Sequence, residues 1–198
     1  ASELFSKACN MNSASWCYYT ALADIQRDGY SNTVISLLNK ACDLNSAPAC
    51  GKLGRWYADV YYADTRGGGV FLSSIHKVDK KTQEILTRAL ALLDKACSMN
   101  DQLGCYRLGK MYYKGRSVLQ NYRKAAKFLK KACNLKGKYT SESCYYTAKI
   151  YYRGKGFADY KEKGVLISYR KAAKFAQKAC NSERRKYALK GCIFLGSL

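Results

Sequence analysis

The segment 105–133, CYRLGKMYYKGRSVLQNYRKAAKFLKKAC, decides the fold of this chain. On both sides of Gly115, apolar residues recur at intervals of three and four positions, which indicates two amphipathic helices. Gly115 is suited to end the first helix, and Asn121 is suited to begin the second. A single hairpin of this kind cannot bury apolar stripes on both of its sides, so the segment predicts neighbouring hairpins of the same type.

A Lys-Ala-Cys triplet ends this segment and occurs five times in the chain. Its cysteines are Cys9, Cys42, Cys97, Cys133 and Cys180. The shortest intervals between triplets are 33 and 36 residues, and a helix–turn–helix unit repeated at this period indicates an α-solenoid. The sequence therefore predicts one solenoid domain over residues 1–198, with about four to five repeats.

Two longer intervals between triplets predict insertions. The interval from Cys42 to Cys97 is 55 residues long, and its surplus predicts an inserted loop near residues 63–80. This loop contains a run of three glycines followed by Val70, Phe71 and Leu72, and we expect it to project from the solenoid. A smaller insertion is predicted near residues 157–165.

The ten cysteines indicate the compartment in which the protein works. After each triplet comes a second cysteine, 8 to 12 residues later: Cys17, Cys50, Cys105, Cys144 and Cys192. A zinc site would need closely spaced cysteine pairs or histidines, and the only histidine is His76. We therefore predict five disulfides, each joining a triplet cysteine to the next cysteine. Disulfides imply an oxidising compartment, so we expect a secreted or periplasmic protein whose signal peptide has been removed.

The pattern LGxxYYxG…YxKAxxxxxKAC resembles the Sel1-like repeat, and its cysteine-flanked form resembles the Helicobacter cysteine-rich protein family. Leu108-Gly109, Tyr112-Tyr113 and Gly115 carry the first part of the pattern. The connector that follows Gly115 departs from the family's Gly-x-Gly-Val-x-x-Asp form, with Asn121 at the acidic position. The resemblance implies an all-α fold: an α/α solenoid of Sel1-like, TPR-like helical hairpins cross-linked by disulfides.

Two alternative functions are compatible with this sequence. The first is a scaffold that binds a protein, a glycan or another polyanion, with a role in host interaction. The second is a weak penicillin-binding protein or β-lactamase, because members of the family have been associated with β-lactam binding and weak hydrolysis. Ser-x-x-Lys elements begin at Ser74 and Ser168, but neither Ser-Asp-Asn nor Lys-Thr-Gly accompanies them. We therefore favour the scaffold and predict no catalytic residue, no metal site and no cofactor.

Charge is distributed unevenly along the chain. Residues 1–100 contain 11 lysines and arginines against 9 acidic residues, whereas residues 101–198 contain 24 against 5. A solvated surface needs charge but not charge of one sign, so the second half predicts an anionic partner. We expect a protein partner, an acidic glycan or another polyanion outside the cytosol, with nucleic acid less favoured. No apolar run is long enough for an integral membrane segment.

Aligning the repeats on their second cysteines places basic residues and tyrosines on one face of each first helix. The predicted ligand-binding residues are Lys52, Arg55, Tyr57, Arg107, Lys110, Tyr113, Lys114, Lys149, Tyr152 and Arg153. The alternative is that the charged row is only a solvated face and that the aligned Tyr112 and Tyr151 belong to the core. The second helices carry a separate basic strip, which we favour less: Lys124, Lys127, Lys131, Lys171, Lys174 and Lys178.

Overall fold

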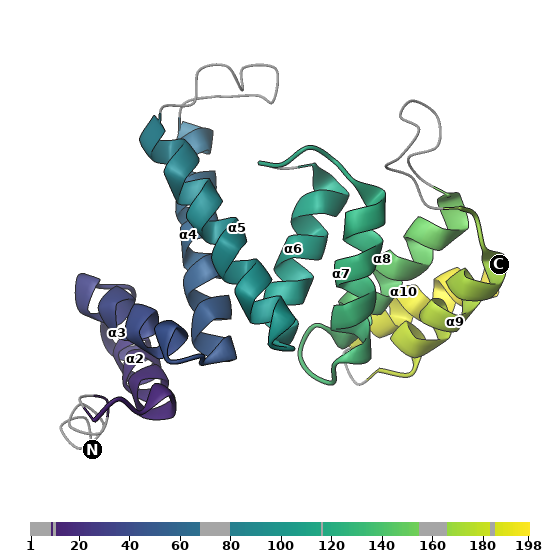
Figure 1. Cartoon of the computed structure of the whole chain (residues 1–198). Coiled ribbons are helices and arrows are strands. Elements are labelled where there is room, and N and C mark those ends of the chain that lie inside the picture. Colours follow the sequence, from purple (N-terminus) through teal and green to yellow (C-terminus); the bar gives the residue numbers. More distant parts are fainter. Residues whose placement is uncertain (1–8, 10, 68–79, 116, 155–165, 183–184) are drawn as a thin grey trace. The chain divides into compact units, whose positions relative to one another are not determined.

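The computed structural model describes residues 9, 11–67, 80–115, 117–154, 166–182 and 185–198 (Figure 1). Its helices are α2 (Ala14–Asp28), α3 (Asn32–Asp43), α4 (Ala47–Gly67), α5 (Lys80–Ser98), α6 (Gln102–Lys114), α7 (Tyr122–Asn134), α8 (Thr140–Arg153), α9 (Tyr169–Cys180) and α10 (Arg185–Gly196). These described ranges contain no strand, which confirms the all-α prediction. The chain divides into two compact units, Ala1–Gly104 and Cys105–Leu198.

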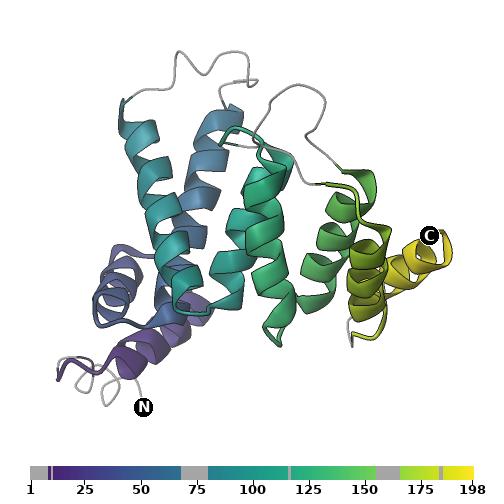
Figure 2. The same ribbon diagram turned by 45° about the vertical axis from the view of Figure 1, so that its right-hand side comes forward.

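The first unit contains two helical hairpins. Helix α2 packs on α3, α3 packs on α4, and α4 pairs with α5. Figures 1 and 2 both show α4 and α5 side by side. The first hairpin and the start of α4 share a core in which Val34, Leu38 and Leu53 are fully buried. Burial of these side chains holds the amphipathic helices together.

The hairpin of α4 and α5 is longer than the sequence predicted. Helix α4 continues through Gly67, so residues 63–67 of the predicted loop are helical. Residues 68–79, which include Val70, Phe71 and Leu72, lie outside the described part of the chain. The smaller insertion predicted near residues 157–165 lies outside it as well.

In the second unit, α8 packs against α7, α9 and α10, and α10 also packs against α9. Tyr112 of α6 stacks on Phe128 of α7, with ring centroids 5.9 Å apart and planes 10° apart. One hairpin later, Tyr151 of α8 stacks on Phe175 of α9 at the same distance and at 7°. The repeated stack joins the two helices of each hairpin. It therefore supports the interpretation that these two tyrosines are packing residues.

The second helix of a hairpin begins at a side-chain cap in three cases, which are α3, α7 and α9. The Oγ of Ser31, the Oδ1 of Asn121 and the Oγ of Ser168 each accept a hydrogen bond from a backbone N–H three residues later. Such caps satisfy one of the N–H groups that a helix leaves without an intrahelical partner. Asn121 thus begins α7, as the sequence predicted. Gly115 ends α6 with a φ of 62°, a conformation that glycine adopts without strain.

Disulfides join the end of each second helix to the start of the next helix. The structure contains the pairs Cys9–Cys17, Cys42–Cys50, Cys133–Cys144 and Cys180–Cys192. Cys97 and Cys105 are also disulfide-bonded, so no cysteine among the described residues is free. The predicted pairing of each triplet cysteine with the next one is confirmed for these four pairs.

The alanine of the triplet permits close approach between the disulfide-linked helices. Ala96 and Ala179 are fully buried. A Cβ added at Gly104 would lie 2.8 Å from the Cβ of Ala96, and one at Gly191 would lie 2.7 Å from the Cβ of Ala179. Small residues therefore face each other directly beside these cysteines.

The lysine of the triplet reaches back to the preceding second helix. The Nζ of Lys95 donates a hydrogen bond of 2.8 Å to the backbone carbonyl of Cys42. The Nζ of Lys178 donates one of 2.9 Å to the Oδ1 of Asn134. Because each acceptor lies at the end of the second helix of the preceding hairpin, these bonds tie successive hairpins together.

None of the helices in the described ranges is long and apolar enough to cross a membrane.

Candidate binding surface on the inner helices

The predicted site residues of the first unit make contacts within α4 and with α5. Arg55 forms an exposed ion pair of 3.3 Å with Asp59, one turn further along α4. The ring of Tyr57 packs edge-on against Trp56, with centroids 4.8 Å apart, and lies 4.9 Å from the guanidinium of Arg88. Lys52 is half-buried. These contacts position Tyr57 between two neighbouring helices of its own hairpin.

The second unit gathers aromatic side chains on its inner helices α6, α8 and α10. We call this group the tyrosine surface: Tyr113, Tyr145, Tyr146, Tyr152, Tyr187 and Phe194. Each of its side chains is partly exposed. The helical spacing of the tyrosines on α8 gives that helix two aromatic edges, which face α6 and α10. The surface therefore combines residues from three consecutive inner helices.

Ring contacts connect the whole tyrosine surface. Tyr146 lies 4.9 Å from Tyr113 and 5.5 Å from Tyr145. Tyr145 in turn contacts Phe194 at 6.2 Å, and Phe194 contacts Tyr152 at 5.2 Å in an edge-to-face arrangement. These centroid distances are those of favourable aromatic packing. The rings consequently hold one another in place while part of each remains in contact with solvent.

Two predicted cations lie at the tyrosine surface. The Nζ of Lys149 is 5.5 Å from the ring centroid of Tyr145. Arg153 is exposed, and its positive charge acts on Tyr113 and Tyr145. Burial, followed by interaction with neighbouring tyrosines, raises the pKa of Tyr113 and of Tyr145, and the charge of Arg153 opposes this rise without reversing it. Both hydroxyls therefore remain protonated hydrogen-bond donors at neutral pH.

Lys110 is engaged inside the second unit. Its Nζ forms an ion pair of 2.7 Å with Glu142 of α8, and both side chains are only 15% exposed. The same ammonium lies 4.1 Å from the ring centroid of Tyr146. We infer that Lys110 positions α6 against α8, so the charge that a partner meets comes from other residues.

Glu142 accepts hydrogen bonds from three groups. Lys110 and the hydroxyls of Tyr106 and Tyr187 all donate to its carboxylate. Burial alone would raise the pKa of Glu142, but the hydrogen bonds and the charge of Lys110 outweigh burial and lower it. Burial and the neighbouring carboxylate raise the pKa of Tyr106 and of Tyr187. The donors come from α6 and α10, so one carboxylate of α8 joins the three inner helices.

The remaining predicted residues of α6 lie apart from the tyrosine surface. Arg107 is half-buried beside Tyr106, whose pKa its charge lowers in part. Lys114 is exposed at the end of α6. The structure thus brings together Tyr113, Lys149 and Tyr152 with Arg153. That these residues bind a ligand stays a prediction.

Sequence reasoning missed several members of this surface. The paired Tyr145-Tyr146 follows Cys144 directly, as Tyr18-Tyr19 follows Cys17, and this recurrence was a usable signal. Glu142 was harder to identify, because residues 105–198 contain four acidic residues. Tyr187 and Phe194 carried no comparable signal, since the last repeat lacks the tyrosine pair.

The structure describes one of the two Ser-x-x-Lys elements, the one that begins at Ser168. Ser168 is the N-cap of α9, and its Oγ accepts a hydrogen bond of 3.3 Å from the backbone N–H of Lys171. This contact gives Ser168 a structural role in starting the helix. Ser74 and His76 lie outside the described residues. The residues that the structure describes contain no group of histidine, cysteine and acidic side chains able to hold a metal ion.

Repeated helical hairpins, linked end to start by disulfides, define a disulfide-stabilised α/α repeat protein. The Sel1 repeat family matches residues 86–101, 102–136 and 141–183. Residues 86–183 of this chain therefore contain Sel1 repeats. A search of curated proteins found no significant match.

Two solved structures show the same fold. A protective antigen present in uropathogenic Escherichia coli strains is 18% identical, with a TM-score of 0.70 over 100% of this chain. This chain spans only 37% of the length of that protein. A Sel1 repeat protein from Oxalobacter formigenes is 19% identical, with a TM-score of 0.66 over 99% of this chain and 67% of its own. Helicobacter pylori cysteine rich protein B is 29% identical over 72% of this chain and 88% of its own, with a TM-score of 0.47.

Proposed function

We propose that this protein is a non-catalytic binding scaffold of an oxidising compartment, and that its tyrosine surface binds a partner protein through an acidic segment. One observation carries the proposal. Six partly exposed aromatic side chains adjoin Lys149 and Arg153, and Glu142, the only acidic side chain in the described part of the unit, is already paired with Lys110. The surface therefore offers apolar area and positive charge together.

The residue types of this surface suit recognition of a protein. Tyrosine and arginine are enriched among the residues that dominate interface energies, because they combine apolar area with hydrogen-bond donors. The ring contacts restrain these side chains before a partner arrives, which lowers the entropy lost on binding. Lys149 and Arg153 add attraction for an acidic segment and raise its rate of association.

The disulfides support a location outside the cytosol. All described cysteines are disulfide-bonded, and such bonds persist in secreted and periplasmic proteins. Each bond also constrains the unfolded chain, which stabilises the folded scaffold. Such a scaffold, secreted or periplasmic, would meet envelope or host proteins.

A selection experiment tests the proposal directly. A phage-displayed library of acidic peptides is selected against the oxidised protein, and the affinity of the best peptide is measured by isothermal titration calorimetry. Lys149→Glu combined with Arg153→Glu should weaken binding by about tenfold or more, because both cations lie at the tyrosine surface. The matched control is Lys124→Glu combined with Lys174→Glu, which changes the charge equally on the second helices and should have little effect. Equal losses in the two variants, or failure to select any peptide, would contradict the proposal.

A further inference from the structure

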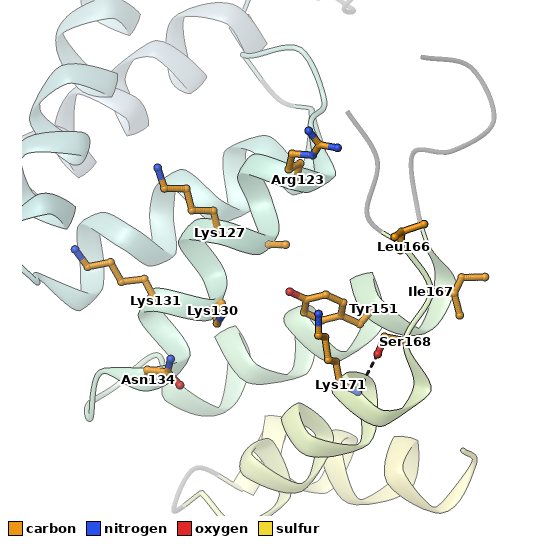
Figure 3. A pocket seen from close by; sticks show the side chains of 11 residues that line it. Arg123, Lys127, Lys130, Lys131, Asn134, Tyr151, Leu166, Ile167, Ser168 and Lys171 are labelled. Atoms are coloured by element: carbon orange, nitrogen blue, oxygen red, sulfur yellow. Dashed lines mark hydrogen bonds between the residues drawn. The ribbon is translucent and has the colours of Figure 1, made fainter. Parts of the chain in front are cut away.

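The second helices form a basic groove that is separate from the tyrosine surface. It lies between α7, the end of α8 and the start of α9, and its volume is about 980 Å³. Its cationic lining consists of Arg123, Lys127, Lys130, Lys131 and Lys171. Figure 3 shows the first four along α7, with Lys171 on the other side of Tyr151. The groove contains residues of the basic strip that the sequence analysis favoured less.

Four cations of this groove, Arg123, Lys127, Lys130 and Lys171, form no ion pair with the described part of the unit. None of the described residues that line the groove is acidic. Glu142 is held by Lys110. Among the described residues, Lys127 and Lys171 contact aromatic rings, with Nζ 5.8 Å from Phe128 and 5.4 Å from Tyr151. Such cation–π contacts leave the ammonium groups available for an anion.

We infer that this groove binds a linear, multiply sulfated or phosphorylated glycan. The α-helical rise places Arg123 and Lys130 about 10 Å apart along α7, so a ligand must carry several anionic groups at intervals to meet these cations. Lys171 supplies charge from the opposite wall. A chain of anionic sugars that lies along the groove would satisfy both walls at once.

The apolar lining favours sugar rings over nucleic-acid bases. Single-stranded nucleic acids bind by stacking bases on open aromatic faces. Among the described residues, Tyr151 is the only aromatic side chain in the lining, and it stacks on Phe175 and lies 5.4 Å from the Nζ of Lys171. Its hydroxyl remains a donor for an anion, while Leu166 and Ile167, which are 71% and 56% exposed, offer apolar contact to the C–H faces of sugars.

The hollow shape disfavours a lipid bilayer as the ligand. A flat membrane surface would reach the exposed rim at Leu166 and Ile167 but not the lining between α7 and α9. A flexible glycan chain can enter the groove and contact Tyr151 in its lining. The volume also lies within the range of small-ligand sites.

The sequence of α9 differs from that of α7 at a position that lines the groove. Helix α9 repeats the α7 sequence almost completely, but Gln177 occupies the position that corresponds to Lys130. Helix α7 therefore carries one more cation on this face than α9 does.

The test measures binding of a heparin-derived hexasaccharide to the full, disulfide-intact chain by fluorescence anisotropy. Combining Lys127→Glu with Lys130→Glu should weaken binding by about tenfold or more, and the wild-type affinity should fall steeply between 50 and 200 mM salt as counterion release requires. Lys124→Glu combined with Lys174→Glu is the matched control, because these exposed lysines lie on the same helices but do not line the groove. We expect the control to stay within about threefold of the wild type.

Further measurements distinguish a glycan from a lipid surface or a nucleic acid, and they test whether the variants fold. Lys130→Gln introduces the residue that α9 already has, so it should fold normally and still weaken binding by about threefold. Vesicles that contain phosphatidylglycerol and a thymidine hexanucleotide serve as alternative probes. Equal losses in the two double variants, no loss in the groove variants, or tighter groove-dependent binding of vesicles or oligonucleotide would overturn the inference. Peptide binding at the tyrosine surface should survive the groove variants, so this inference and the proposed function can fail separately.

Discussion

Lys110 and Glu142 form an ion pair of 2.7 Å between α6 and α8, and only 15% of each side chain is exposed. Tyr106 of α6 and Tyr187 of α10 donate hydrogen bonds to the same carboxylate. The lysine at the centre of the α6 row therefore contacts a neighbouring helix of its own unit. Glu142 in turn contacts residues of both other inner helices.

Glu142→Gln should destabilise the protein in a pH-dependent manner. The folded-state pKa of Glu142 is lowered, so its contribution to stability is full above the unfolded value of about 4.3 and is lost as pH falls through the folded value. At pH 7 we expect a loss of about 2 kcal/mol, because Lys110 is left without its charged partner. The difference from wild type should shrink in acid. Urea unfolding at pH 7 and pH 3 measures it, with the exposed Glu84→Gln as control, and an equal difference at both pH values would contradict the assignment.

Gly109→Ala should destabilise the second unit, although alanine favours helices. An added Cβ would lie 2.5 Å from the Cγ and 3.0 Å from the backbone nitrogen of Leu129. We expect a net loss of about 1–3 kcal/mol, because the overpacking exceeds the helix-propensity gain of about 1 kcal/mol. Gly196→Ala is the control, since nothing lies within 4 Å of its added Cβ. If thermal unfolding shows both variants to be equally stable, Gly109 is not a close-packing position.

Most of the fold was predictable from the sequence, because the same pattern of a helical hairpin followed by a cysteine pair recurs along the chain. The Lys-Ala-Cys triplet predicted the disulfides, and Gly115 and Asn121 predicted the ends of α6 and α7. The extension of α4 to Gly67 was missed, because the surplus length between two triplets was assigned to a loop from residue 63, whereas the helix continues to the first glycine of the run. The length of an insertion does not show how much of it is helical.

The candidate binding surface was less predictable than the fold. Helical spacing placed Lys110 in a row with Arg107 and Lys114, but it could not show that Glu142 lies opposite Lys110. That contact joins residues 32 positions apart, and one sequence does not reveal which side chain of the next hairpin faces a given lysine. The basic groove depends likewise on how α7 and α9 meet, so the spacing of their lysines alone did not favour it.

Lys95→Met should weaken the attachment of the second hairpin to the first. The Nζ of Lys95 donates to the carbonyl of Cys42 in a partly buried bond, and methionine keeps the alkyl stem while removing the donor. We expect a loss of about 1.5 kcal/mol, as for other hydrogen bonds from charged groups. Urea unfolding of the oxidised protein measures it, with the exposed Lys174→Met as control. A loss no larger than that of the control would show that the triplet lysine does not contribute to stability.

Ser168→Ala should lower stability without affecting any reaction with penicillin. Its Oγ caps α9 by accepting a hydrogen bond from the backbone N–H of Lys171. Loss of such a cap lowers the free energy of unfolding by about 1 kcal/mol. Asn121→Ala removes the corresponding cap of α7 and should cost a similar amount, so it controls for helix fraying. Covalent labelling with a fluorescent penicillin should be the same in both variants and in the wild type, because the Oγ of Ser168 is engaged with its own helix. A hundredfold loss of labelling in Ser168→Ala alone would instead identify Ser168 as a nucleophile.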